Sequence, residues 1–203
     1  MYVWLYGALI CICWLLLVIS IVLMEVLVEI AEHTFIKPAL QQLELQFIAY
    51  VQQFVTPPLT AEVMLVTASG SSTFYLLASA LVCCWYLYSR QKDRLYLYLV
   101  CLCGGGILNQ VLKRIFERVR PDIFPVIAES GYSFPSGHAM GADFVFYGIL
   151  AYFAGLGLRS KPLRWGLMAA AGSYILLIGL SRVYLGVHYP TDILAGYAAG
   201  ATW

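Results

Sequence analysis

The first 24 residues of the chain contain no charged side chain. A helix rises about 1.5 Å per residue, so one of this length crosses a hydrocarbon core roughly 30 Å thick. A cleaved signal peptide is the alternative, but a basic start and a small-residue cleavage site are missing, and Glu25 and Glu29 follow directly. The sequence therefore predicts a retained membrane-spanning helix.

Five further apolar runs predict five further spans. They lie within 63–89 and over 95–112, about 137–158, 165–181 and about 193–203. The last run is too short to cross a bilayer, so we expect the chain to end inside a helix. Only 11% of the residues are charged, against about 25% in a soluble domain, so lipid has to cover much of the surface. Because a backbone in lipid must pair its polar groups internally, we expect an all-α fold. We expect this fold to be a polytopic membrane helical bundle of six transmembrane helices, of which the last one is truncated. The bundle forms a single domain over 1–203.

The segment 31–59, between the first two predicted spans, mixes apolar and polar residues. Its large apolar side chains recur at roughly helical spacing, with Gln and Glu between them: Leu43, Leu45, Phe47, Ile48, Val51 and Phe54. This pattern predicts an interfacial amphipathic helix that connects two spans along the membrane surface. A re-entrant or lipid-guiding role is the alternative.

Two short loops, 89–94 and 159–164, set the expected orientation because both are rich in basic residues. The positive-inside rule places such loops in the cytoplasm, together with the N-terminus. The connections 113–136 and 183–191 then lie on the extracytoplasmic side of the cell membrane. The net charge of +1 offers no field for nucleic acid. The six cysteines all lie inside apolar runs and form no metal-ligand pattern.

Five cations lie on the predicted outer side, against the rule that set the orientation: Lys113, Arg114, Arg118, Arg120 and Arg182. One interpretation is that the topology is inverted, or that Glu117, Asp122 and Glu129 neutralise the cations. The other is an anion site at the bilayer surface. The charges alone do not separate these interpretations, so the spacing of the residues has to decide.

Three motifs contain or adjoin these cations. They are KRIFERVRP (113–121), PSGH (135–138) and SRVYLGVHYPTD (181–192). The first motif ends the third predicted span, the second begins the fourth, and the last joins the fifth to the sixth. In a compact bundle all three meet at one membrane interface, and we expect the chemistry there.

The motifs contain the groups that a phosphate needs. A phosphoryl group in its transition state spreads charge over three oxygens, which fixed cations and N–H donors stabilise. If Pro135 is the first residue of a helix, the N–H groups of 136–138 have no intrahelical partner and can meet an anion. The expected phosphate-binding residues are Lys113, Arg120, Ser136, Gly137 and Arg182.

Two of the three histidines, His138 and His188, also lie in the motifs. His188 and Asp192 are four residues apart, a spacing that puts side chains on one helical face. A carboxylate on one ring nitrogen fixes the tautomer and leaves the other nitrogen as a nucleophile. His138 would then protonate the leaving alkoxide and later activate water. The expected catalytic residues are therefore His188, His138 and Asp192.

The combination of K-x6-RP, PSGH and SR-x5-H-x3-D resembles the signature of the type-2 phosphatidic acid phosphatase superfamily. Every position of the pattern is present over 113–192. The resemblance implies a six-helix core, a phosphohistidine at His188, His138 as the acid and Asp192 as the orienting carboxylate. It also implies hydrolysis without a metal or other cofactor, and inhibition by vanadate. The soluble haloperoxidase branch of the superfamily does not fit a chain that is embedded in a membrane.

The expected function is hydrolysis of a terminal phosphate from a lipid phosphate or pyrophosphate in the bilayer. Resembling bacterial proteins act on phosphatidylglycerophosphate, undecaprenyl pyrophosphate or phosphatidate, and the first two are favoured. The rival hypothesis is a small transporter or channel with an outer anion-binding site and no hydrolysis. It explains the cations but gives no reason for the pairing of His188 with Asp192. Under the third hypothesis, a structural protein without activity, the presence of every motif would be a coincidence.

Several polar residues near the motifs have open roles. Asp143 is an intramembrane acid that we expect to pair with a cation or polar group inside the bundle. Asn109 and Gln110, one turn before Lys113, are expected to form interhelical hydrogen bonds. Arg118 either contacts a lipid head group or belongs to a solvated loop.

Overall fold

The computed structural model of the chain describes residues 22, 25–26, 29, 38–123 and 125–203. Apart from Val22, the predicted first span over 1–24 lies outside the described residues. The side chain of Asp143 also lies outside the described part, so its expected pairing stays a prediction.

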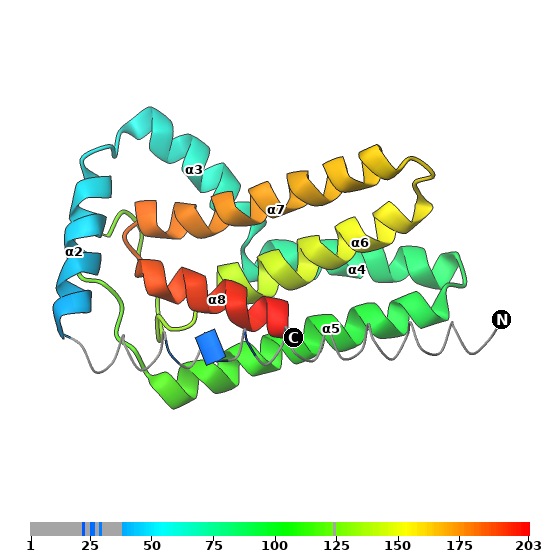
Figure 1. Ribbon diagram of the computed structural model, residues 1–203, viewed down its shortest axis with the longest axis horizontal. Helices are drawn as coiled ribbons and strands as arrows, with labels where there is room; N and C mark the ends of the chain where they lie inside the picture. Colours follow the sequence, from blue (N-terminus) through cyan, green and yellow to red (C-terminus); the bar gives the residue numbers. More distant parts are fainter. Residues whose placement is uncertain (1–21, 23–24, 27–28, 30–37, 124) are drawn as a thin grey trace.

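Every regular element in the described ranges is a helix, which confirms the all-α class for that part of the chain (Figure 1). In order, the elements are α2 (Pro38–Gln52), α3 (Pro57–Ser69), α4 (Ser72–Tyr88), α5 (Lys92–Phe116), η1 (His138–Tyr147), α6 (Gly148–Gly157), α7 (Lys161–Tyr184) and α8 (Pro190–Thr202). η1 is a π-helical stretch that runs directly into α6, and the two together occupy the predicted span over about 137–158.

Two helices, α5 with 25 residues and α7 with 24, are each long and apolar enough to cross a membrane. The pair α3 and α4 would make a third span, bent by 46° at its break. The run predicted as a span within 63–89 therefore contains the break between the two helices. Gly70 ends α3, and the Ser71 hydroxyl accepts a 3.2 Å hydrogen bond from the N–H of Phe74, which caps a new helix. The total of six spans stays a prediction.

The helices lie along one another with α2 across one end of the bundle (Figure 1). The α4–α5 and α6–α7 turns, which contain the basic loops 89–94 and 159–164, lie together at the opposite end. The segments before η1 and between α7 and α8 lie at the end covered by α2. The three motifs are therefore at the far end of the bundle from the basic loops.

The α2 helix has an unusual distribution of side chains for a surface helix. Ile48 is fully buried against Val183 and Ile193 at the ends of α7 and α8. Large apolar side chains of the same helix point outward, including Leu43 and Phe47, while the carboxylate of Glu44 is buried. An apolar outer face suits contact with lipid, and the placement of α2 at the membrane surface stays a prediction.

Close packing between α8 and η1 fixes the two elements that bear the motif residues. At Gly196 a Cβ would lie 2.8 Å from the Cβ of Ala139 and 2.9 Å from the carbonyl oxygen of Ser136, so only glycine permits this approach. The N–H of Ser136 donates to the carbonyl oxygen of Asp192 at 2.9 Å. The start of η1 is thereby fixed against the start of α8.

Candidate active site

The three motifs meet at a pocket of about 450 Å³. Five of the eight predicted site residues line it: Lys113, Arg120, Gly137, His138 and His188. They come from the end of α5, the loop after it, the start of η1 and the loop between α7 and α8. Segments that are up to 75 residues apart in the sequence thus supply one cationic cavity with two imidazoles.

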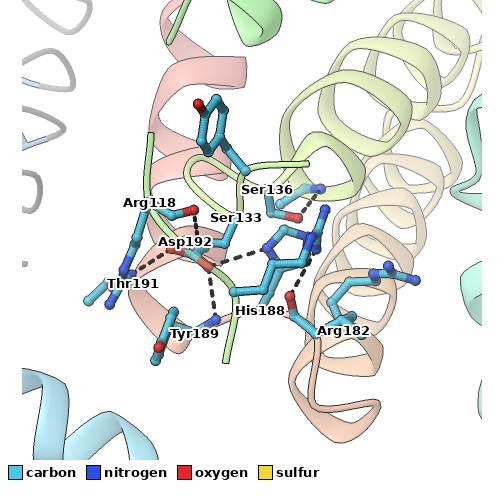
Figure 2. A network of polar contacts seen from close by, with 12 residues as sticks. Arg118, Ser133, Ser136, Arg182, His188, Tyr189, Thr191 and Asp192 are labelled. Carbon is cyan, nitrogen blue, oxygen red and sulfur yellow. Dashed lines mark hydrogen bonds and ion pairs between the residues drawn. The ribbon is translucent and has the colours of Figure 1, made fainter. Parts of the chain in front are cut away.

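His188 is held by groups on both of its ring nitrogens. Its Nδ1 lies 3.3 Å from Oδ2 of Asp192 (Figure 2). Its Nε2 lies 3.1 Å from Nη1 of Arg120. A guanidinium can only donate, so Nε2 accepts and the proton of the neutral ring lies on Nδ1. The nitrogen that carries the lone pair therefore faces the cationic side of the site.

The turn between α7 and α8 explains how His188 and Asp192 are brought together. Gly186 adopts φ 71°, a left-handed conformation that favours glycine, and Pro190 begins α8. Asp192 is the third residue of α8, and its Oδ2 accepts the N–H of Tyr189 at 2.9 Å. One carboxylate thus caps the helix and orients the imidazole.

Burial lowers the pKa of His188 to about 4, although the hydrogen bond and charge of Asp192 act to raise it. Arg120 and Arg182 lower the pKa further through their positive charges. The ring is therefore neutral at pH 7, as a nucleophile must be.

Backbone carbonyls hold the cations of the first motif in place. Arg120 donates from Nε to the carbonyl of Gly131 at 3.1 Å and from Nη1 to that of Val187 at 2.9 Å. The ammonium of Lys113 donates to the carbonyl of Tyr132. Both cations point into the pocket from fixed positions, so little reorganisation is needed to meet an anion.

Glu129 lies among these cations. Its Oε1 pairs with Nη2 of Arg182, and its Oε2 lies 3.8 Å from Nη2 of Arg120. Glu129 also lines the pocket. A carboxylate that meets two guanidinium groups has the kind of contacts that a phosphate would make.

Arg182 does not line the pocket, although the sequence predicts it as a phosphate ligand. Only 2% of its side chain is exposed, and its Nη1 donates to Oγ1 of Thr67 at 2.8 Å. Arg182 nevertheless pairs with Glu129, which lines the cavity. Its predicted contact with phosphate stays a prediction.

Ser136 is also buried, and the local expectation for it was wrong. The helix begins at His138, and Pro135, which follows a cis peptide bond, precedes it rather than opening it. The N–H of Ser136 bonds to the carbonyl of Asp192, and its hydroxyl accepts the N–H of Ala139 at 3.4 Å. Both groups are therefore used to hold the start of η1.

Gly137 and His138 present the free groups of this motif. Among the described residues, the N–H of Gly137 and the ring of His138 have no hydrogen-bond partner, and both residues line the pocket. A Cβ at Gly137 would lie 3.2 Å from Oδ1 of Asn109, so α5 passes close to this backbone. The side-chain N–H of Asn109 also contacts the sulfur of Met140 at 3.5 Å, which confirms its expected interhelical role.

Arg118 and Glu44 are site residues that sequence reasoning did not find. Arg118 is buried, and its Nη1 lies 2.6 Å from Oδ1 of Asp192, as Figure 2 shows. Its Nη2 lies 2.6 Å from Oε2 of Glu44 on α2. The solvated-loop interpretation of Arg118 is therefore wrong. The one available signal for Glu44 was an acid within an apolar-rich interfacial segment.

Comparisons with known proteins agree with the motifs. The profile of the PAP2 superfamily matches residues 94–203. The chain is 40% identical over 149 residues to phosphatidylglycerophosphatase B of Bacillus subtilis (strain 168), which covers 72% of each chain. It is 36% identical over 107 residues to a lipid A 1-phosphatase of Rhizobium johnstonii, which covers 48% of this chain and 39% of that protein.

Two solved structures share the fold. The crystal structure of the transmembrane PAP2 type phosphatidylglycerolphosphate phosphatase from Bacillus subtilis superimposes with a TM-score of 0.83 at 32% identity, over 90% of both chains. Aquifex aeolicus LpxE gives a TM-score of 0.60 at 24% identity, over 77% of this chain and 89% of that one, which speaks for the fold alone. From its profile match and its Bacillus relative, the chain belongs to the PAP2 superfamily.

Proposed function

We propose that this protein is an integral membrane enzyme that hydrolyses the terminal phosphate of a lipid phosphate or pyrophosphate through a phosphohistidine at His188. The observation that carries the proposal is the neutral His188 ring, bonded to Asp192 on one nitrogen and facing the cationic groups with the other. A transporter would need the cations but not this pair.

In the first step Nε2 of His188 attacks phosphorus, and the bond from phosphorus to the ester oxygen breaks. The electron pair leaves with the lipid oxygen, which takes a proton from His138. Lys113 and Arg120 stabilise the charge on the phosphoryl oxygens. Asp192 compensates the positive charge that forms on the phosphorylated imidazole.

In the second step a water molecule attacks the phosphohistidine. His138 takes the proton from this water, the bond between nitrogen and phosphorus breaks, and inorganic phosphate leaves. The His188 ring returns to its neutral form, so the cycle closes without a redox change. Each step needs one proton transfer, and His138 alternates between acid and base.

Phosphatidylglycerophosphate is the favoured substrate because the Bacillus relative named for that activity matches most of the chain. The pocket supports a lipid substrate, because it continues past the histidines along α5 and η1 to Gly106 and Gly141 and to Tyr75 on α4. The leaving group of the lipid can occupy that extension. Undecaprenyl pyrophosphate and phosphatidate are the alternatives that the same chemistry admits.

A panel of lipid phosphates offered to the detergent-solubilised protein tests this function. We expect release of inorganic phosphate, fastest from phosphatidylglycerophosphate, and unchanged in excess chelator because cations of the chain replace a metal. Liberated phosphate is the quantity to measure. No release from any lipid phosphate would contradict the function, and a loss in chelator that added metal restores would contradict the metal-free mechanism.

We further propose that the site faces the extracytoplasmic side of the cell membrane, with the N-terminus in the cytoplasm. The positions of the basic loops 89–94 and 159–164 support this orientation, since both lie at the opposite end of the bundle from the site (Figure 1). A short-chain lipid phosphate that cannot cross the membrane, added to intact cells, should be hydrolysed as fast as in lysed cells. Hydrolysis that requires lysis would overturn the orientation.

A further inference from the structure

A chain of alternating charges runs from α2 to His188. Glu44, Arg118 and Asp192 follow one another through two contacts of 2.6 Å, and Asp192 then meets Nδ1 of His188. The exposed fractions of the first three side chains are 4%, 7% and 0%, so the network is shielded from water. The electrostatic attraction between charges is screened less in such surroundings than at a surface.

Further contacts fix the geometry of this network. Glu44 also accepts the N–H of Thr191 at 3.0 Å and its hydroxyl at 2.6 Å, through Oε1. The guanidinium of Arg118 lies 3.8 Å from the centre of the Tyr189 ring and donates to Oγ1 of Thr191 at 2.8 Å (Figure 2). Thr191, which follows Pro190, is thus held by α2, a helix that contributes nothing to the pocket lining, and Tyr189, which precedes Pro190, packs against Arg118.

Asp192 alone would be a poor orienting group in this place. A fully buried carboxylate tends to take up a proton, and a protonated carboxyl would not hold the His188 proton on Nδ1. Burial raises the pKa of Asp192, but the hydrogen bond to His188 and the charge of Arg118 together lower it below its usual value. Arg118 pairs with the oxygen that His188 does not use.

Arg118 alone would neutralise Asp192 and weaken its effect on His188. The formal charges of Glu44, Arg118 and Asp192 sum to −1, whereas Arg118 and Asp192 by themselves sum to zero. The phosphorylated imidazole that retains its proton on Nδ1 is a cation, so it needs the remaining negative charge. Glu44 supplies that charge and also fixes the second side of the guanidinium fork.

We propose that Glu44 and Arg118 are positioning residues for catalysis, which act on His188 through Asp192. The proposal rests on the proposed role of His188 as nucleophile. It gives α2 a part in the reaction beyond that of an interfacial connector.

The test compares Glu44→Gln with Glu44→Asp in the full-length protein, using steady-state kinetics with phosphatidylglycerophosphate. By comparison with other partners of catalytic groups, we expect Glu44→Gln to lower kcat about 10- to 100-fold. The KM should stay within about twofold of the parent value, because Glu44 lies outside the pocket lining. Glu44→Asp keeps the charge and should recover a large part of kcat.

Glu62→Gln is the matched control, because Glu62 is an exposed carboxylate on the neighbouring helix α3 and lies outside the network. It should leave kcat unchanged. Arg118→Lys is a second variant for the case that Glu44→Gln does not fold. It keeps the positive charge but has no fork to bridge two carboxylates, so kcat should fall about 10-fold or more.

Thermal unfolding of each variant, measured beside the kinetics, separates positioning from folding. Parental kcat in folded Glu44→Gln or Arg118→Lys would overturn the proposal. A loss of activity that matches the loss of folded protein, with no recovery in Glu44→Asp, would also overturn it. These results would leave the proposed function standing, since that function is tested separately by the panel of lipid phosphates and by the activity of His188→Ala.

Discussion

Replacement of His188 by alanine should reduce phosphate release by about 10⁴-fold or more. The nucleophile of a covalent mechanism has no substitute nearby, because the second ring in the pocket, His138, has no carboxylate beside it among the described residues. Phosphate release from phosphatidylglycerophosphate measures the effect. Brief reaction with a substrate labelled in its terminal phosphate, followed by denaturation, should leave label on the parent protein and none on His188→Ala.

The control for this experiment is His33→Ala, since His33 is the third histidine and belongs to none of the three motifs. It should keep parental activity and parental labelling. If folded His188→Ala still released phosphate at a substantial fraction of the parental rate, the phosphohistidine mechanism would be wrong.

Replacement of His138 by alanine should slow cleavage of a lipid phosphate about 10²- to 10⁴-fold, the usual contribution of a general acid. The loss should be far smaller with an aryl phosphate, because a phenolate with electron-withdrawing substituents leaves without a proton. Rapid-mixing measurement of the first burst of alcohol or phenol isolates this step from the later hydrolysis of the phosphoenzyme.

The ratio between the loss of rate with the lipid phosphate and the loss of rate with the aryl phosphate decides whether His138 acts as the acid. Equal losses in the burst phase for lipid and aryl substrates would show that His138 does not act as the acid. The His188→Ala protein provides the reference, because it should give no burst with either substrate.

The parts of the site that follow from local spacing could be predicted from the sequence. The pairing of His188 with Asp192 depends on four residues of one turn, and the structure shows the two side chains in contact. The meeting of the motifs required only that spans alternate in direction, and the pocket contains residues of all three. The first prediction uses the geometry of one turn, and the second uses only the order of the spans along the chain.

The parts that depend on contacts distant in sequence could not be predicted. Arg118 meets Glu44 and Asp192, each 74 residues away, and no spacing rule connects them. For the same reason the sequence could not show that Arg182 lies outside the pocket lining and pairs with Glu129 and Thr67. Charge in a loop indicates that partners are needed, but only the fold decides which ones.

The break between α3 and α4 has a signal in the sequence that the prediction of a span within 63–89 did not use. The run Ser69–Gly70–Ser71–Ser72 contains the residues that end one helix and cap the next. A hydropathy average over the whole run hides these four positions. The π-helical winding of η1, in contrast, has no known signal in the residues themselves.

Glu129 has a consequence for how the enzyme would behave in a phosphate-rich medium. Its carboxylate already contacts Arg182 and approaches Arg120, and because it is tethered to the protein it competes at a high effective concentration. Free inorganic phosphate can displace the Glu129 carboxylate only through its own charge. A phosphate attached to a lipid is concentrated in the membrane beside the pocket and gains contacts from the rest of the molecule. We therefore expect weak product inhibition, so that turnover continues where free phosphate is abundant.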